Sequence, residues 1–368
     1  GTATVTWGRA ARAAIDDARY KMSELWRCKP SEVVFTSGGT EANLSAMVTA
    51  RETWRSKNPE KAHTRGMIIA SNAAHSSISA MAKVIDADVC LIKTEDRLEG
   101  SVLETKIEKL SNEDRSRLFA IIATGGTTNS GIIDDLAGIA KVAKKEDLWL
   151  HVDAAYGGGA LAARSVRHLF NGIEEADSIT IDPHKWLFSP YDCGAVIYRE
   201  PELAKKTHSQ EGSYLDIFTD PGAHGFNPTD YQIQLTRRLR GLPLWFSLAM
   251  HGTDRYEKAI ERGIELAQIA GRLITEADHV ELVREPSLSC VLFRRIGWTP
   301  ENYKAWTYKN HKDGFALVTP TKWRNPNGPE TVARFCFINP DTSEDDIAQI
   351  LETMRSESDR SSHSKAVL

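Results

Sequence analysis

The sequence predicts an α/β protein: a large domain with a mostly parallel sheet, followed by a smaller α/β domain. Short apolar runs alternate with segments whose apolar residues recur at helical spacing, which is typical of strands alternating with helices. The strand-like runs are apolar throughout, as expected for parallel strands covered on both faces. Because the pattern changes after Trp245, we expect the large domain over residues 1–250 and the small one over 251–368.

The individual elements follow from local patterns. Apolar residues recur at helical spacing over residues 9–27, which predicts a helix, and the apolar run 33–36 predicts a strand. Thr40 is expected to cap a helix that extends to about Lys57. The same reasoning predicts strands at 67–70, 89–92, 118–123, 148–152, 178–181 and 195–198, with helices at 76–85, 102–110 and 136–145. In the small domain we expect helices at 253–276 and 344–354, strands at 291–294 and 334–338, and a frayed polar tail over 356–368.

The composition excludes several classes of protein. The chain has 368 residues, of which 41% are apolar and 26% charged, and a formal net charge of −4. These values are typical of a globular protein and argue against a nucleic acid or a membrane surface as partner. No apolar run is long enough for a transmembrane helix, and the first residues do not have the pattern of a signal peptide. The five cysteines are scattered singly, so we expect no disulfide framework, no zinc site and a cytoplasmic location.

The segment Ile181-Asp182-Pro183-His184-Lys185 carries the strongest chemical signal. It ends an apolar run with a lysine, a residue that is disfavoured beside buried strands unless it is paired. A lysine shielded from water can hold an aldehyde as an imine, and Asp182 and His184 are placed to set its surroundings. The alternative is an ordinary surface lysine.

Two further segments complete a pattern. Asp153 ends the predicted strand 148–152 and can pair with a protonated pyridine nitrogen, although it could instead cap the next loop or form a metal pair with His151. Ser37-Gly38-Gly39-Thr40 can aim backbone N–H groups at a phosphate, or can be a structural turn. A phosphate cradle, a carboxylate and a lysine are the three anchors of pyridoxal phosphate (PLP), and all three follow predicted strands, where ligands of parallel sheets bind.

Weaker candidates lie in the same kind of position. His75 could stack on one face of the cofactor ring, and Ala154 and Ala155 are small enough for the other face to lie against the chain. Thr127 and Thr128 follow a glycine pair and could reach the cofactor with a hydroxyl. Each of these residues has an ordinary structural explanation as well.

Taken together, these motifs resemble the group II PLP-dependent decarboxylases, the family of the aromatic-L-amino-acid, histidine and tyrosine decarboxylases. The resemblance extends from about residue 36 into the C-terminal domain and is most specific between His151 and Trp245. It rests on His75-Ser76-Ser77, Gly126-Thr127-Thr128, His151-Val152-Asp153-Ala154-Ala155-Tyr156, Asp182-Pro183-His184-Lys185-Trp186, Tyr191-Asp192-Cys193 and residues 230–238.

The resemblance implies a fold type I PLP enzyme, a lyase that works as a homodimer and decarboxylates an L-amino acid, with an aromatic substrate favoured. It implies that Lys185 binds the cofactor aldehyde, that Asp153 pairs with the pyridine nitrogen, and that His75 stacks opposite Ala155. It further implies that Gly39, Thr40 and Thr128 help hold the cofactor, with Asp182 near the phosphate and His184 beside the lysine. Tyr214 matches the tyrosine of a mobile catalytic loop that protonates the α-carbon.

Two departures leave alternatives open. Family members carry a longer N-terminal region, which is missing from this sequence by truncation, by lack of order or by real absence. Residues 7–43 are more similar to cysteine desulfurases, which need a nucleophilic cysteine, whereas Cys290 and Cys336 lie in apolar runs that predict burial. A catalytically silent relative that binds PLP or a partner enzyme is the remaining alternative.

Overall fold

The computed structural model describes residues 6–210, 227–325 and 328–355 and divides into two compact units. The first unit comprises residues up to Thr127 together with Ile133–Glu257. The second comprises Thr128–Ile132 and the chain from Lys258 onward. Helix α8 (Gly241–Glu276) has residues in both units and is kinked at Gly252, whose φ is 70°. Each unit is described separately below.

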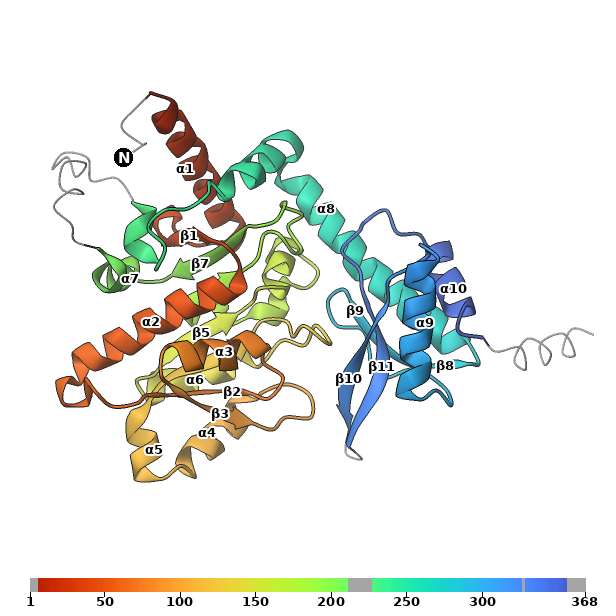
Figure 1. The fold of residues 1–368 in the computed structure, drawn as a ribbon, viewed down its shortest axis with the longest axis horizontal. Coiled ribbons are helices and arrows are strands. Elements are labelled where there is room, and N and C mark those ends of the chain that lie inside the picture. Colours follow the sequence, from red (N-terminus) through yellow and green to blue (C-terminus); the bar gives the residue numbers. More distant parts are fainter. Residues whose placement is uncertain (1–5, 211–226, 326–327, 356–368) are drawn as a thin grey trace, which may run out of the picture. The chain divides into compact units, whose positions relative to one another are not determined.

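The first unit is built on a seven-stranded sheet (Figure 1). Its strands are β1 (Val33–Thr36), β2 (Met67–Ser71), β3 (Asp88–Ile92), β4 (Leu118–Thr124), β5 (Trp149–Asp153), β6 (Ser178–Ile181) and β7 (Gly194–Tyr198). Its helices are α1 (Thr6–Trp26), α2 (Gly39–Lys57), α3 (Ser76–Val84), α4 (Gly100–Glu108), α5 (Asn112–Arg117), α6 (Leu136–Lys145) and α7 (Pro201–His208). Strands and helices alternate, as the sequence predicts.

The strand order is β1-β7-β6-β5-β4-β2-β3, and β7 is the one strand that runs antiparallel to its neighbours. The other six strands therefore end at the same edge of the sheet. All seven residues of β4 and all five of β5 are buried, which explains why their sequences are almost continuously apolar. The predicted mostly parallel sheet is confirmed.

Helix α2 packs across the sheet and contacts β4, β5, β6 and β7 (Figure 1). Its small apolar residues, among them Ala42 and Ala46, join a buried cluster with Ile122 of β4 and Val196 of β7. Alanines on this face allow the helix backbone to approach the strands closely, so polar side chains at the same depth, such as Asn43, reach the sheet itself.

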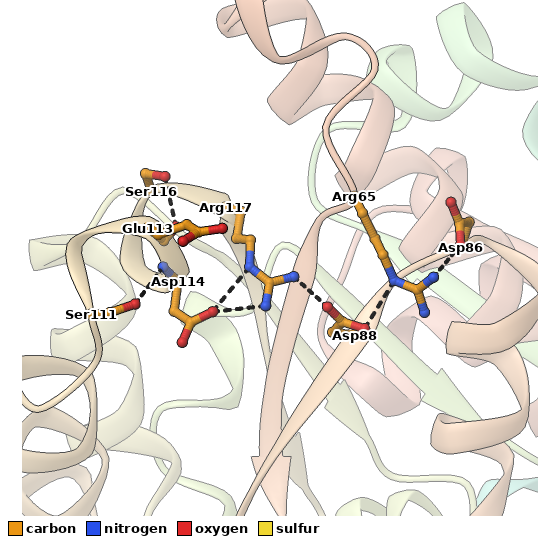
Figure 2. A network of polar contacts seen from close by, with 8 residues as sticks. All are labelled: Arg65, Asp86, Asp88, Ser111, Glu113, Asp114, Ser116 and Arg117. Carbon is orange, nitrogen blue, oxygen red and sulfur yellow. Dashed lines mark hydrogen bonds and ion pairs between the residues drawn. The ribbon is translucent and has the colours of Figure 1, made fainter.

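Ion pairs lie at the edge of the sheet where β2, β3 and β4 begin, away from the edge where these strands end (Figure 2). Arg117 bridges Asp88 and Asp114, and Arg65 bridges Asp86 and Asp88, with Nη1–Oδ1 of Arg65 and Asp86 at 2.8 Å. The Arg117 guanidinium lowers the pKa of Asp88. These charges are paired with one another on the surface, so the network has a structural explanation.

The second unit packs the later part of α8 and two helices, α9 (Pro300–Lys312) and α10 (Glu344–Glu352), against a four-stranded sheet. The sheet order is β10-β11-β9-β8, all antiparallel, with bounds β8 (Val280–Leu282), β9 (Cys290–Arg295), β10 (Thr319–Asn325) and β11 (Gly328–Cys336). Its core contains Phe293, Phe335 and Ile347.

Some details differ from the sequence predictions. Gly38, not Thr40, precedes the first residue of α2, so Thr40 is the second residue of the helix. Strand β11 begins six residues earlier than predicted and ends at Cys336, before Phe337. Helices α5, α7 and α9 and strands β8 and β10 were not predicted, because their sequences are short or strongly polar.

Candidate active site

The predicted anchor residues follow neighbouring strands at one edge of the first unit's sheet. Asp153 is the last residue of β5, Asp182 directly follows β6, and Gly38 lies between β1 and α2. Because β5 and β6 are paired, with Asp153 opposite Thr180, the two carboxylates belong to adjacent strand ends. The sheet thus assembles in space what the chain separates by more than a hundred residues.

Lys185 reaches back to Asp182 across a tight turn. The Lys185 Nζ lies 2.9 Å from Asp182 Oδ2, and the Lys185 backbone N–H donates to the Asp182 carbonyl at 2.9 Å. The Lys185 side chain is 40% exposed, whereas that of Asp182 is only 2% exposed. Burial raises the pKa of Asp182, and the charge of Lys185 opposes that rise. The lysine is therefore accessible to a ligand and is paired with a buried carboxylate.

His184 lies near the same oxygen of Asp182. Its Nδ1 accepts from the Cys193 N–H at 3.0 Å, so a neutral ring carries its proton on Nε2, which is 3.6 Å from Asp182 Oδ2. Burial lowers the pKa of His184, although the Asp182 charge opposes this. The ring also packs on Tyr191, with centroids 4.7 Å apart. His184 is thereby fixed in place beside the lysine turn.

The glycine turn fits closely around Asp182. A Cβ on Gly39 would lie 3.0 Å from Asp182 Oδ2 and 3.1 Å from the Ala155 Cβ, and one on Gly38 would lie 3.2 Å from His184 Cε1. The glycines are needed for this close approach. The first turn of α2, which includes Thr40, has backbone N–H groups with no partner inside the helix, as the first turn of any helix does. That arrangement suits an anion such as a phosphate.

Asp153 is held from two sides. Its Oδ2 accepts from Asn43 Nδ2 at 2.9 Å, and its Oδ1 accepts from the Ala155 N–H at 3.1 Å. The side chain is buried, and each oxygen keeps a further lone pair for another donor. Asp153 does cap the following loop, as one alternative expected, through its bond to the Ala155 N–H. Its two hydrogen bonds nevertheless leave lone pairs on both carboxylate oxygens unused.

His151 is a residue whose place the sequence did not reveal. It is fully buried in β5, and its ring bonds to Asn43 Oδ1 at 2.9 Å and to Ser178 Oγ at 2.8 Å. Burial lowers its pKa to about 4. No group of three or more His, Cys, Asp or Glu side chains among the described residues could hold a metal ion. The sequence did contain one signal for this role, a histidine inside an otherwise apolar strand. A buried polar ring needs hydrogen-bond partners, so such a histidine predicts a buried network.

The buried His151 is expected to make the protein less stable in acid. Its pKa falls from an ordinary 6.5 to about 4 on folding, so the unfolded chain takes up the proton first. The stability that the neutral ring confers is present above pH 6.5 and is lost as the pH falls towards 4, by up to about 3 kcal/mol. His151→Gln should therefore flatten the fall of the urea midpoint between pH 7 and about 4.

The matched control for this measurement is His63→Gln, because His63 is exposed. That variant should keep the wild-type slope. An unchanged slope in His151→Gln would show that the ring is not buried in its neutral form.

His75 caps helix α3 rather than standing alone. Its Nδ1 accepts from the Ser77 N–H at 3.2 Å and lies 2.9 Å from Ser77 Oγ. The ring is exposed, whereas Ser77 is buried beneath it. Ser77 Oγ in turn lies 3.4 Å from Asn43 Nδ2. His75 is therefore joined through Ser77 and Asn43 to Asp153.

The remaining predicted residues lie elsewhere. Ala155 lies two residues after Asp153, the last residue of β5, and is half-buried. Thr128 is exposed and belongs to the second unit, where its carbonyl accepts from Arg334 at 2.6 Å. Tyr214 lies outside the described residues. The geometry above consequently covers Lys185, Asp182, His184, Asp153, Gly39, Thr40, Ala155 and His75.

The cysteines differ in part from the prediction. Cys290 is buried, but Cys336 is exposed, because alternation along the chain turns Phe335 and Phe337 inward and Cys336 outward. Cys193 is buried, and burial raises the pKa of its thiol to about 12, so it is a poor nucleophile. None of the helices over the described ranges has the length and apolarity that crossing a membrane requires.

The residues present fit PLP. Asp182 Oδ1 is buried without a hydrogen-bond partner, so the site contains an unused acceptor next to the lysine. The glycine turn leaves no side chain between that carboxylate and the start of α2. Lys185 offers an accessible amine for the aldehyde, and Asp153 offers a carboxylate with free lone pairs for the pyridine nitrogen. The start of α2 offers an anion-binding helix terminus for the phosphate.

Comparisons with known proteins agree that the site suits PLP. Residues 20–296 match the family model described as the pyridoxal-dependent decarboxylase conserved domain. The chain is 31% identical over 363 residues to an aromatic-L-amino-acid decarboxylase of Bacillus atrophaeus, covering 95% of this chain and 74% of that protein. It is 32% identical to an L-2,4-diaminobutyrate decarboxylase of Acinetobacter baumannii, covering 73% of this chain and 56% of that protein.

The fold agrees as well. A solved Oryza sativa structure described as TDC with PLP and tryptamine superposes with a TM-score of 0.84 at 25% identity, covering 94% of this chain and 76% of that one. The predicted fold type and the predicted PLP cofactor are confirmed by these matches. The chain spans little more than half of the Acinetobacter relative, so part of that relative's length has no counterpart here. The chain belongs to the pyridoxal-dependent decarboxylase family.

Proposed function

We propose that this protein decarboxylates an L-amino acid, with an aromatic side chain, to the corresponding amine and carbon dioxide. The observation that carries the proposal is the placement of an accessible Lys185 against buried Asp182, one strand away from Asp153. When bound, PLP supplies an aldehyde that captures the substrate amine and a ring that accepts the electron pair of the broken Cα–carboxylate bond.

Lys185 and Asp182 are placed for the first proton transfer, from the lysine ammonium to the carboxylate. An ammonium group must lose a proton before its nitrogen can act as a nucleophile. Asp182 Oδ2, 2.9 Å from Lys185 Nζ, is within hydrogen-bond distance to accept it, and burial raises the pKa of this carboxyl. The Nε2 of His184, whose ring is held by Cys193, lies 3.6 Å from the same carboxylate oxygen. These residues thus prepare the lysine to bind the cofactor covalently.

Asp153 and the loop behind the site provide orientation. Asp153 keeps lone pairs for the protonated ring nitrogen, which keeps the ring an acceptor of electrons. Tyr156 and Trp186, stacked with centroids 5.2 Å apart, pack the loops after Asp153 and Lys185 against each other. Both aromatic rings are buried, so this contact fixes the two loops that carry the residues proposed to bind the cofactor.

The aromatic preference rests on the resemblance and on the Bacillus atrophaeus relative, which is named for aromatic substrates. The Acinetobacter baumannii relative is named for L-2,4-diaminobutyrate, which makes that amino acid the principal competitor. Release of carbon dioxide should be measured with a panel of the standard amino acids and L-2,4-diaminobutyrate. Turnover confined to tryptophan, tyrosine or phenylalanine is expected. Turnover of diaminobutyrate alone would overturn the aromatic preference, and no release from a PLP-loaded protein would overturn decarboxylation.

We propose that Tyr214 protonates the α-carbon after carbon dioxide leaves, on the strength of its match to the family's catalytic loop. In Tyr214→Phe, carbon dioxide should still be released, because that step does not need the phenol. Dioxygen should then oxidise the substrate carbon, giving an aldehyde, ammonia and hydrogen peroxide in place of the amine. Chromatography of the products together with a peroxide assay distinguishes the two reactions. Clean amine at an unchanged rate would exclude Tyr214 as the donor.

We also propose a homodimer, as the resemblance implies. Sedimentation of the PLP-loaded protein should give about twice the mass of one chain, 40.9 kDa. A monomer with full activity would contradict this part of the proposal.

A further inference from the structure

One series of hydrogen bonds in the first unit leads to Asp153 through side chains that have no role of their own in the proposed reaction. It begins at Trp149, at the start of β5, and ends at Asp153, at the end of the same strand. Between them it passes through Ser178 of β6, His151 of β5 and Asn43 of α2. Asn43 comes from the helix that packs across these strands in Figure 1. The series therefore links a helix and two strands to the carboxylate.

The two ends of the series fix the direction of every bond. The Trp149 indole N–H can only donate, and it donates to Ser178 Oγ at 2.8 Å. The Ser178 hydroxyl could still accept from or donate to His151 Nδ1 at 2.8 Å, and the Asp153 carboxylate at the other end, which can only accept, decides between the two. Burial lowers the pKa of His151 to about 4, so the ring is neutral at physiological pH.

The Asn43 amide bonds to both Asp153 and His151, so its orientation settles the remaining bonds. Because the carboxylate can only accept, the Asn43 NH₂ group faces it and Asn43 Oδ1 faces His151 Nε2 at 2.9 Å. Nε2 therefore carries the imidazole proton, and the Ser178 hydroxyl donates to Nδ1. The Asn43 NH₂ group donates to Asp153 Oδ2 at 2.9 Å. The flipped amide would place its oxygen against the carboxylate and its N–H against the His151 N–H, two repulsive contacts. The Asn43 amide is thus held between the Asp153 carboxylate and the His151 Nε2–H.

A branch leads from the same amide to His75. Asn43 Nδ2 lies 3.4 Å from Ser77 Oγ, and Ser77 Oγ lies 2.9 Å from His75 Nδ1. Because the Ser77 N–H also donates to Nδ1, the proton of a neutral His75 lies on Nε2. One amide group therefore touches Asp153 directly and reaches His75 through a single hydroxyl.

The side chains of this network are shielded from water. Asn43 is 1% exposed, His151 is 0% exposed and Ser178 is 1% exposed. Water has little access to replace a lost partner, so each side chain depends on the next. The network lies immediately behind Asp153 rather than in contact with a ligand, which is the position of a group that orients another.

We propose that Asn43 and His151 are positioning residues for Asp153, which they hold with its free lone pairs available to the ring nitrogen of PLP. This inference rests on the proposed role of Asp153. It predicts that Asn43 matters for the ring nitrogen in particular and not for the phosphate or the aldehyde. A cofactor analogue with carbon in place of the ring nitrogen, 1-deaza-PLP, isolates that contribution.

The test compares how tightly the full-length protein, stripped of cofactor, binds PLP and 1-deaza-PLP. The wild-type protein should prefer PLP. In Asn43→Ala this preference should fall by roughly tenfold or more, as for other residues that orient a ligand-binding group. A merely structural Asn43 would weaken both cofactors equally and leave the ratio unchanged, and that result would overturn the proposal.

Control variants separate the possible failures. Ser45→Ala lies on the same helix, and its buried hydroxyl has no partner, so the ratio should stay at the wild-type value. Asp153→Ala should abolish the preference. If it does not, the proposed role of Asp153 is wrong and the inference falls with it. If Asp153→Ala loses the preference and Asn43→Ala keeps it, the proposed function stands and only this inference fails.

A second pair of variants covers the case in which Asn43→Ala does not fold. His151→Gln keeps an N–H that can donate to Asn43 Oδ1, whereas His151→Leu removes it. The glutamine variant should retain most of the preference for PLP, and the leucine variant should lose it. Equal ratios in the two folded variants would contradict a directional role for His151.

Discussion

Replacing Lys185 by alanine is expected to abolish the absorption band of the lysine–cofactor imine and to lower turnover by roughly 10³-fold or more. The Lys185 Nζ, paired with Asp182 at 2.9 Å, is the amine that our account assigns to the cofactor aldehyde. PLP should still bind weakly, because the glycine turn and the start of α2 are unchanged. Absorbance spectra and carbon dioxide release measure the two effects.

A lysine at the other end of helix α2 serves as the control. Lys57 is 59% exposed and pairs with Asp147 at 3.1 Å, so Lys57→Ala should keep both the imine band and the turnover. A Lys185→Ala protein that keeps the imine band and remains active would remove this lysine from the reaction.

The second large effect is expected for Asp153→Asn. The substitution keeps the shape of the side chain and removes the charge that our account pairs with the ring nitrogen. Loss of such an electrostatic contact should lower kcat by roughly 10²–10³-fold. Because Asn43 donates to Asp153 Oδ2, the variant amide should keep its oxygen toward Asn43. Steady-state kinetics of the PLP-loaded variant, with the cofactor content measured, give the result.

The control carboxylate for this experiment is Asp177, just before β6. It accepts from the Leu150 N–H at 2.8 Å and pairs with Arg199, at the opposite edge of the sheet from Asp153. Asp177→Asn is expected to change stability but not kcat. Near-wild-type turnover in Asp153→Asn would leave Asp153 with a structural role only.

The sequence predicted the sheet of the first unit well because its strands are continuous apolar runs bounded by polar residues. Burial of every residue of β4 and β5 is the physical cause of that pattern. Strand β10, with the sequence TPTKWRN, carries no such signal, because it is an edge strand whose residues are mostly polar. Helix α9 was missed for a similar reason, since only Tyr303, Trp306 and Asn310 along it are buried.

The sequence could predict those site residues that lie at or just after the end of a strand. Lys185, Asp182 and Asp153 follow buried strands, so their chemistry could be inferred from position alone. The link between Asn43 and His151 could not, because the two residues are 108 positions apart and meet only when α2 packs on β5. The wrong expectation that Cys336 is buried has the opposite cause, since an apolar run in an antiparallel strand can have one exposed face.

The most direct test of the central claim is to locate the cofactor on the chain. The PLP-loaded wild-type protein should be reduced with borohydride, digested and analysed by mass spectrometry. We expect a pyridoxyl group on the peptide that contains Lys185, next to Asp182-Pro183-His184. A pyridoxyl group on any other lysine, or on none, would contradict it.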